Sequence, residues 1–75
     1  MKLSELKKGE RCKVISINNF NPLLRRRMLD MGITNGVEIK VKKIAPFGDP
    51  IDIELRGYEL CLRKVDLSNI EVIKL

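Results

Sequence analysis

Residues 51–62, IDIELRGYELCL, predict a β-hairpin, and the rest of the fold can be built around it. Apolar and acidic residues alternate through Ile51–Leu55, which is the two-residue period of a strand with one buried face. Arg56 and Gly57 separate this run from a second one, and glycine accepts the positive φ that tight hairpin turns require. The inward row of the second strand is expected to be Tyr58, Leu60 and Leu62.

Three further runs of apolar residues predict strands. Val37, Ile39 and Val41 alternate cleanly with charged residues, and Ile70–Ile73 reads as a last strand. In Arg11–Ile17 the apolar residues change phase along the run, which indicates either a β-bulge or a strand covered on both faces. Together with the hairpin, these runs make five strands.

One helix of appreciable length is predicted between the first two strands. Asn21 is a favourable N-cap and Pro22 suits the first helical position, where its missing N–H is not needed. The helix should run to about Met31, with Gly32 in the left-handed position of a Schellman motif. A single helical turn is also expected over Asp66–Asn69.

The element order is therefore strand, helix, three strands, a short turn and a strand. Five short strands in a chain this small favour a strongly bent barrel, because an open sheet would leave long edges exposed. We expect a mostly β fold, a small five-stranded barrel with one α-helix inserted between the first and second strands. The chain of 75 residues is expected to form a single domain, residues 1–75.

Composition limits the compartment and the chemistry. No secretory signal follows Met1 and no apolar run reaches the ~20 residues of a membrane span, so we expect a soluble cytoplasmic protein without a Cys12–Cys61 disulfide. Histidine is absent, and the two cysteines lie far apart in the sequence, which excludes the usual zinc sites and most catalytic triads. We predict no enzyme activity, no cofactor and no metal site.

Three carboxylates, those of Asp49, Asp52 and Glu54, are the remaining candidates for a hard-cation site. Asp52 and Glu54 occupy the outward face of the first hairpin strand, where alternating charge is the ordinary solvent-facing pattern. A surface role is therefore the preferred interpretation of these residues.

The net charge of +5 favours an anionic partner, either nucleic acid, a membrane surface or an acidic protein face. A small basic barrel that binds nucleic acid is the alternative function. Such barrels use aromatic platforms for stacking, and here the aromatic residues are Phe20, Phe47 and Tyr58 only, with Tyr58 assigned to the inward row. We therefore expect weak, salt-sensitive binding and no specific nucleic acid partner.

The predicted helix carries apolar residues on two sides. Leu24, Met28 and Met31 form one stripe, which should face the barrel. Leu23 and Leu29 lie on the opposite side and flank Arg26, within a run of three arginines. Either this side binds a partner, or loops and the amino-terminal segment cover both leucines.

The sequence resembles the FeoA family along nearly its whole length. The resemblance rests on Leu24–Ile33, Asn35–Ile39, Ala45–Ile51, Arg56–Leu60 and Leu62–Arg63, with Leu3, Leu6 and Gly9 at the start. FeoA proteins are similar to SH3 barrels with an inserted helix, so the resemblance implies an SH3-like fold.

The resemblance also implies a function. FeoA proteins are cytoplasmic companions of FeoB, the bacterial ferrous iron transporter, which carries a cytoplasmic G-protein domain. The implied role is that of a non-enzymatic accessory protein in Fe²⁺ uptake, which contacts this transporter and reaches the membrane through it alone. Self-association into a homo-oligomer stays open. The candidate contact residues are Leu23, Arg25, Arg26 and Leu29, with Phe47 as a second candidate surface.

Overall fold

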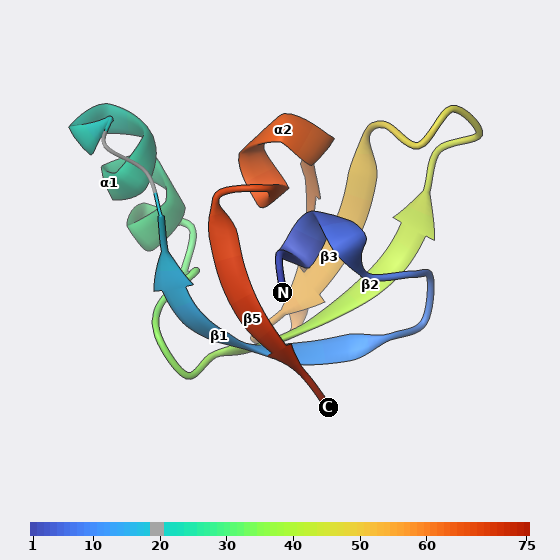
Figure 1. Ribbon diagram of the computed structural model, residues 1–75, viewed down its shortest axis with the longest axis horizontal. Helices are drawn as coiled ribbons and strands as arrows, with labels where there is room; N and C mark the ends of the chain where they lie inside the picture. Colours follow the sequence, from blue (N-terminus) through green and yellow to red (C-terminus); the bar gives the residue numbers. More distant parts are fainter. Residues whose placement is uncertain (19–20) are drawn as a thin grey trace.

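Five antiparallel strands form one strongly curved sheet in the computed structural model, which describes residues 1–18 and 21–75 (Figure 1). The sheet order is β4-β3-β2-β1-β5, so β4 and β5 are the two edge strands. The strands are β1 (Arg11–Ile17), β2 (Glu38–Ile44), β3 (Ile51–Leu55), β4 (Tyr58–Leu62) and β5 (Ile70–Lys74). Helix α1 (Pro22–Asp30) is inserted between β1 and β2, as predicted.

The predicted β3–β4 hairpin is confirmed, with Leu55 opposite Tyr58 at its closed end. Arg56 and Gly57 form the turn with φ values of 50° and 83°. Two consecutive positive φ angles are typical of the type I′ turn, whose twist matches that of the flanking strands. The apolar residues of β3 are all buried.

The prediction for the inward row of β4 is wrong for Tyr58. Leu60 and Leu62 are half-buried against the core, whereas Tyr58 remains 40% exposed. The physical reason is that β4 is an edge strand, which has a neighbouring strand on one side only. The tyrosine ring instead extends toward the carboxyl end of α1, where its hydroxyl group donates a hydrogen bond.

Two register shifts explain why the alternation of buried and exposed residues is interrupted in β1 and in β2. One lies between Val14 and Ser16 in the β1–β5 ladder, and it leaves Ile15 exposed while Ile17 is buried. The predicted bulge in β1 is therefore confirmed. The other lies between Val41 and Lys43 in the β2–β3 ladder, beyond which Ile44 is partly exposed.

The core is built from the inner faces of the strands and from two short segments outside them, with Met28 and Ile33 added from α1 and the turn after it. The amino-terminal segment contributes Leu3 and Leu6, and α2 (Lys64–Leu67) contributes Leu67. The 3₁₀ turn η1 (Leu3–Glu5) carries the first of these leucines. Buried Cys12 and exposed Cys61 are both free thiols.

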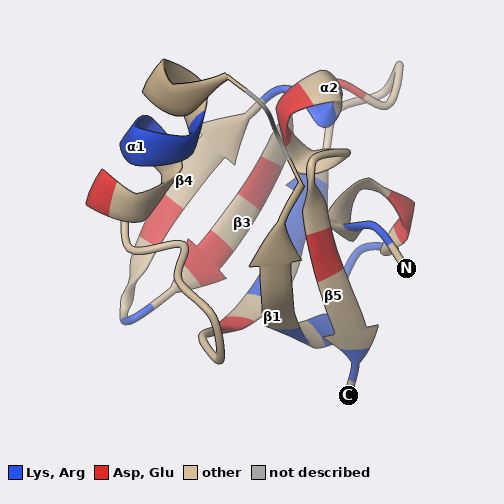
Figure 2. Cartoon of the chain, turned by 60° about the vertical axis from the view of Figure 1, so that its left-hand side comes forward, with Lys and Arg blue, Asp and Glu red and all other residues tan. Residues whose placement is uncertain are grey.

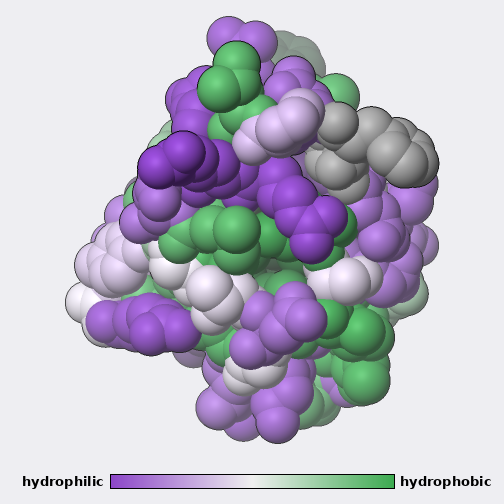
Figure 3. All heavy atoms as spheres, turned by 90° about the vertical axis from the view of Figure 1, so that its left-hand side faces the viewer, coloured by the Kyte–Doolittle hydropathy of each residue, from purple (hydrophilic) through white to green (hydrophobic). Residues whose placement is uncertain are grey.

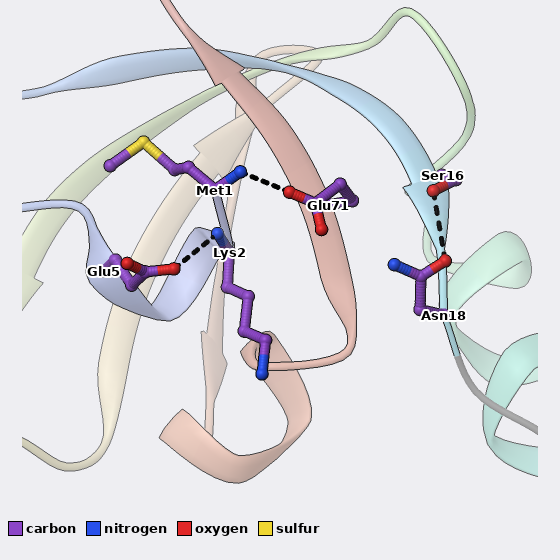
Figure 4. A network of polar contacts seen from close by, with 6 residues as sticks. All are labelled: Met1, Lys2, Glu5, Ser16, Asn18 and Glu71. Carbon is purple, nitrogen blue, oxygen red and sulfur yellow. Dashed lines mark hydrogen bonds and ion pairs between the residues drawn. The ribbon is translucent and has the colours of Figure 1, made fainter.

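Polar contacts fasten the amino-terminal segment to β5 (Figure 4). The amino-terminal ammonium group pairs with the carboxylate of Glu71, and the N–H of Val72 donates to the Met1 carbonyl at 2.8 Å. The Glu5 carboxylate accepts a hydrogen bond from the Lys2 N–H at 2.8 Å. These contacts hold Leu3 in the core.

Helix α1 begins and ends as its sequence predicts. Asn21 Oδ1 accepts a hydrogen bond from the Leu23 N–H at 3.0 Å, and Pro22 is the first helical residue. At the other end, the N–H of Gly32 donates to Leu29 and that of Ile33 donates to Met28, both at 3.0 Å, which is the Schellman pattern. The predictions that involve Asn19 and Phe20 lie outside the described residues.

Candidate protein-docking surface

Helix α1 stands beside the barrel and contributes little to the core (Figure 1). Met28 is the one buried residue among its nine. Leu24 and Met31 are half-buried and pack against the core, which confirms the predicted barrel-facing stripe. The helix is thus attached along one narrow stripe, and most of its surface is available for contact.

The opposite side of α1 carries exposed apolar residues. Leu23 is 75% exposed and Leu29 is 45% exposed, so the interpretation in which other segments cover these leucines is wrong. Arg25, Arg26 and Arg27 are also exposed. Within residues 1–18 and 21–75, the ion pairs do not involve these arginines.

Exposed apolar residues and exposed arginines therefore lie together on one side of the molecule. Figure 2 shows basic residues on α1 and acidic residues along β3 and β4. Figure 3 looks onto the side of α1 and shows apolar surface directly beside strongly hydrophilic surface. Interfaces that bind proteins commonly combine apolar residues with arginine in this way.

A small groove lies between α1 and the segments that it faces. Its volume is about 100 Å³, which suits one apolar side chain. The lining residues are Leu24, Arg27, Met28, Met31, Leu62 and Asp66. Because methionine is flexible and polarisable, this lining can adapt to the shape of the side chain that enters.

Two contacts from the β3–β4 hairpin hold the carboxyl end of α1. The Tyr58 hydroxyl donates a hydrogen bond to the Met31 carbonyl oxygen, and Arg56 Nη2 donates to Thr34 Oγ1 at 3.0 Å. Gly32 allows the close approach, since a Cβ at this position would lie 3.0 Å from the Tyr58 hydroxyl oxygen.

Sequence reasoning missed this role of Tyr58. The available signal is that one polar aromatic residue begins a row that is otherwise aliphatic, and a tyrosine hydroxyl usually requires a hydrogen-bond partner. The acceptor, a carbonyl group 27 positions away in the chain, has no sequence signature.

Phe47 does not join the residues of α1. It lies in the loop between β2 and β3, on the other side of the barrel from the helix (Figure 1), and it is 99% exposed. The structure thus brings Leu23, Leu29 and the arginines together on one helix and places Phe47 on a separate surface.

The thiols and carboxylates show ordinary structural environments. Burial raises the pKa of Cys12 to about 11. The pKa of Cys61 is raised because its thiol is hydrogen-bonded to the Asp52 carboxylate. Asp52 and Glu54 lie half-exposed on β3, as predicted.

Among the described residues, no three histidine, cysteine or acidic side chains gather in a way that would hold a metal ion. Nor does this part of the chain contain a helix long and apolar enough to cross a membrane.

Comparison with protein families identifies the chain. The model of the FeoA domain matches residues 1–74. A relative from Porphyromonas gingivalis, an Fe(2+) transport protein A/Fe(2+) transporter FeoB fusion protein, is 35% identical over 72 residues. The match covers 96% of the chain but only 8% of the fusion protein.

Solved structures agree with this result. The FeoA protein of Chlorobium tepidum is 43% identical and superposes with a TM-score of 0.91, over 100% of this chain and 70% of that one. FeoA of Stenotrophomonas maltophilia, a prokaryotic SH3 domain protein solved with zinc, superposes with a TM-score of 0.86 at 24% identity, over 97% of this chain and 89% of that one. The predicted SH3-like fold is thereby confirmed.

Proposed function

The chain belongs to the FeoA family, which is associated with ferrous iron transport, and from this premise we propose that it is a non-enzymatic accessory protein that docks on a FeoB transporter. The single observation that carries the proposal is the fusion of the two modules in the P. gingivalis relative. Fusion gives two modules a high effective concentration for each other, which is useful when they act in contact.

The docking surface that we propose is the outer side of α1. Leu23 and Leu29 supply apolar area that the barrel does not use, and Arg25 and Arg26 flank them. Burial of such residues in a partner would remove apolar surface from water, and the arginines would select a partner with acidic groups around an apolar centre. The expected partner is the cytoplasmic part of the transporter.

The test is an isothermal calorimetric titration of this protein with the cytoplasmic G-protein domain of a FeoB transporter. Leu23→Asp combined with Leu29→Asp should weaken the complex at least about tenfold, because two apolar contacts are replaced by charges that must be desolvated. Arg26→Glu should weaken it less, and added salt should reduce that difference.

A matched control is available on the edge strand β5. Ile73 is 57% exposed, so Ile73→Asp introduces the same charge as either single α1 substitution at a comparably exposed apolar position. It should leave the affinity unchanged. Equal losses for Ile73→Asp and for the α1 variants would contradict docking through α1. Sedimentation of the free protein at several concentrations would show whether the same leucines also mediate self-association.

A further inference from the structure

Phe47 is the most exposed large apolar side chain among the described residues, at 99%. Its loop is nevertheless well fixed. Gly48 N–H donates to Ala45 at 2.7 Å, and Ala45 N–H donates to the Pro50 carbonyl at 3.1 Å. The Asp49 carboxylate also accepts a hydrogen bond from the Lys64 N–H at 2.8 Å, which ties the loop to α2. The protrusion of the phenyl ring is therefore a property of the fold.

The surface beside this loop combines lysines with apolar residues. A hollow of about 560 Å³ next to the loop is lined by Lys8 and Lys43, by Asp52 and Cys61, and by the apolar residues Ile44, Ala45, Pro46 and Pro50. Lys8 comes from a different part of the chain, and the N–H of Gly9 holds its turn against the Val41 carbonyl at 2.8 Å. The side chain of Lys7 is exposed in the same turn.

Lys8 and Lys43 form no ion pair within residues 1–18 and 21–75. The lysines that form ion pairs there are Lys42 and Lys74. Two carboxylates share this surface: Asp49 accepts a hydrogen bond from the α2 backbone, and Asp52 lies opposite Lys43 in the β2–β3 ladder and is hydrogen-bonded to the Cys61 thiol. The surface is therefore a projecting aromatic side chain beside unpaired basic groups.

We propose that this surface binds an anionic phospholipid bilayer directly, with Phe47 inserted among the headgroups and Lys7, Lys8 and Lys43 on the lipid phosphates. A convex apolar tip fits a fluid bilayer, which needs no preformed pocket, and basic residues near an anionic leaflet add attraction. A nucleic acid would stack on aromatic rings, and among the described residues Phe47 is the one ring on this surface. The contact is additional to docking through α1 and does not depend on it. It departs from the expectation, implied by the family resemblance, that the protein reaches the membrane through the transporter alone.

The direct test uses a tryptophan at the tip. The chain contains no tryptophan, so Phe47→Trp introduces a single tryptophan, whose emission can be excited apart from that of Tyr58. With vesicles of phosphatidylcholine and phosphatidylglycerol, its emission should shift to shorter wavelength and should be quenched by brominated acyl chains. Vesicles of phosphatidylcholine alone should leave the emission unchanged. Absence of a shift with anionic vesicles at low salt would overturn the proposal.

Vesicle co-sedimentation of otherwise unmodified protein identifies the groups responsible. Lys8→Glu combined with Lys43→Glu should lower the partition coefficient at least about tenfold, because each lysine contributes attraction to the anionic surface. Phe47→Ser should also lower it, whereas Phe47→Leu should retain binding, since insertion needs apolar area and not an aromatic ring. Leu23→Asp serves as the control on α1 and should have no effect.

The same variants distinguish lipid from nucleic acid. A single-stranded oligonucleotide that stacks on Phe47 would lose affinity in both Phe47→Leu and Phe47→Ser, because both lack the ring. Two results together would overturn the proposal in favour of the nucleic acid alternative. The oligonucleotide would bind the wild type tightly and lose affinity in both Phe47 variants, and Phe47→Ser would bind vesicles as well as the wild type does.

Discussion

Strand β3 and helix α1 use their apolar residues in opposite ways. Ile51, Ile53 and Leu55 of β3 are all buried, whereas α1 is longer and buries only Met28. Burial of apolar area is the dominant favourable contribution to folding, so the stability of this domain should reside in the strands. The exposed leucines of α1 contribute little to it and are free to serve a partner.

The largest expected effect is the loss of a core side chain from β3. Ile53 is fully buried, and Ile53→Ala should lower the free energy of unfolding by about 2–5 kcal/mol, because the cavity adds to the lost burial. Leu23→Ala on α1 should change it by less than about 0.5 kcal/mol. Denaturant unfolding of the two variants measures the contrast. Similar losses for both would mean that α1 is part of the stabilising core.

A substitution at the end of α1 should have an intermediate effect. Gly32 has a φ of +89°, and an added Cβ would lie 3.0 Å from the Tyr58 hydroxyl oxygen. Gly32→Ala should therefore cost about 1–3 kcal/mol from backbone strain together with crowding. In a Tyr58→Phe background the crowding disappears and only the strain remains, so the cost should be smaller. An unchanged cost in that background would assign the whole effect to strain.

Removal of the tyrosine hydroxyl alone should have a smaller effect. Tyr58→Phe deletes the hydrogen bond to the Met31 carbonyl and should destabilise the domain by about 1 kcal/mol. Amide NMR shifts should change chiefly in residues 28–33, where the hairpin holds α1. Shift changes confined to the hairpin would show that this bond does not position the helix.

At neutral pH the smallest effect is that of the Cys12 thiol, whose contribution to stability changes only at alkaline pH. Because burial raises the pKa of Cys12 to about 11, the folded state favours the protonated thiol. This contribution to stability is fully present below the unfolded pKa and is lost as the pH rises through the folded value. Unfolding of Cys12→Ala should lack this component of the pH dependence. Identical pH profiles between 9.0 and about 11 would contradict it.

Local sequence signals predicted much of this fold. The turn at Arg56 and Gly57, the cap at Asn21 and the termination at Gly32 each depend on neighbouring residues, and each is found in the structure. The exposure of Tyr58 was missed because it depends on β4 being an edge strand, which is a property of the whole sheet.

The candidate site was predicted less completely. Helical periodicity assigned Leu24 to the barrel-facing side of α1 and Leu23 to the opposite side. Whether Leu23 is exposed depends on whether distant segments of the chain cover that side, which periodicity does not show. The separation of Phe47 from α1 is likewise a consequence of how the barrel closes. The hollow beside the loop that carries Phe47 includes Lys8, which comes from the first turn of the chain, and no local sequence pattern relates Lys8 to this loop.

The most direct measurement of the central claim compares one double variant with the wild-type protein in calorimetric titrations with the cytoplasmic domain of a FeoB transporter. Leu23→Asp combined with Leu29→Asp should melt at nearly the wild-type temperature and should bind at least about tenfold more weakly, because these side chains serve the partner and not the core. Wild-type affinity in this folded double variant would contradict docking through α1.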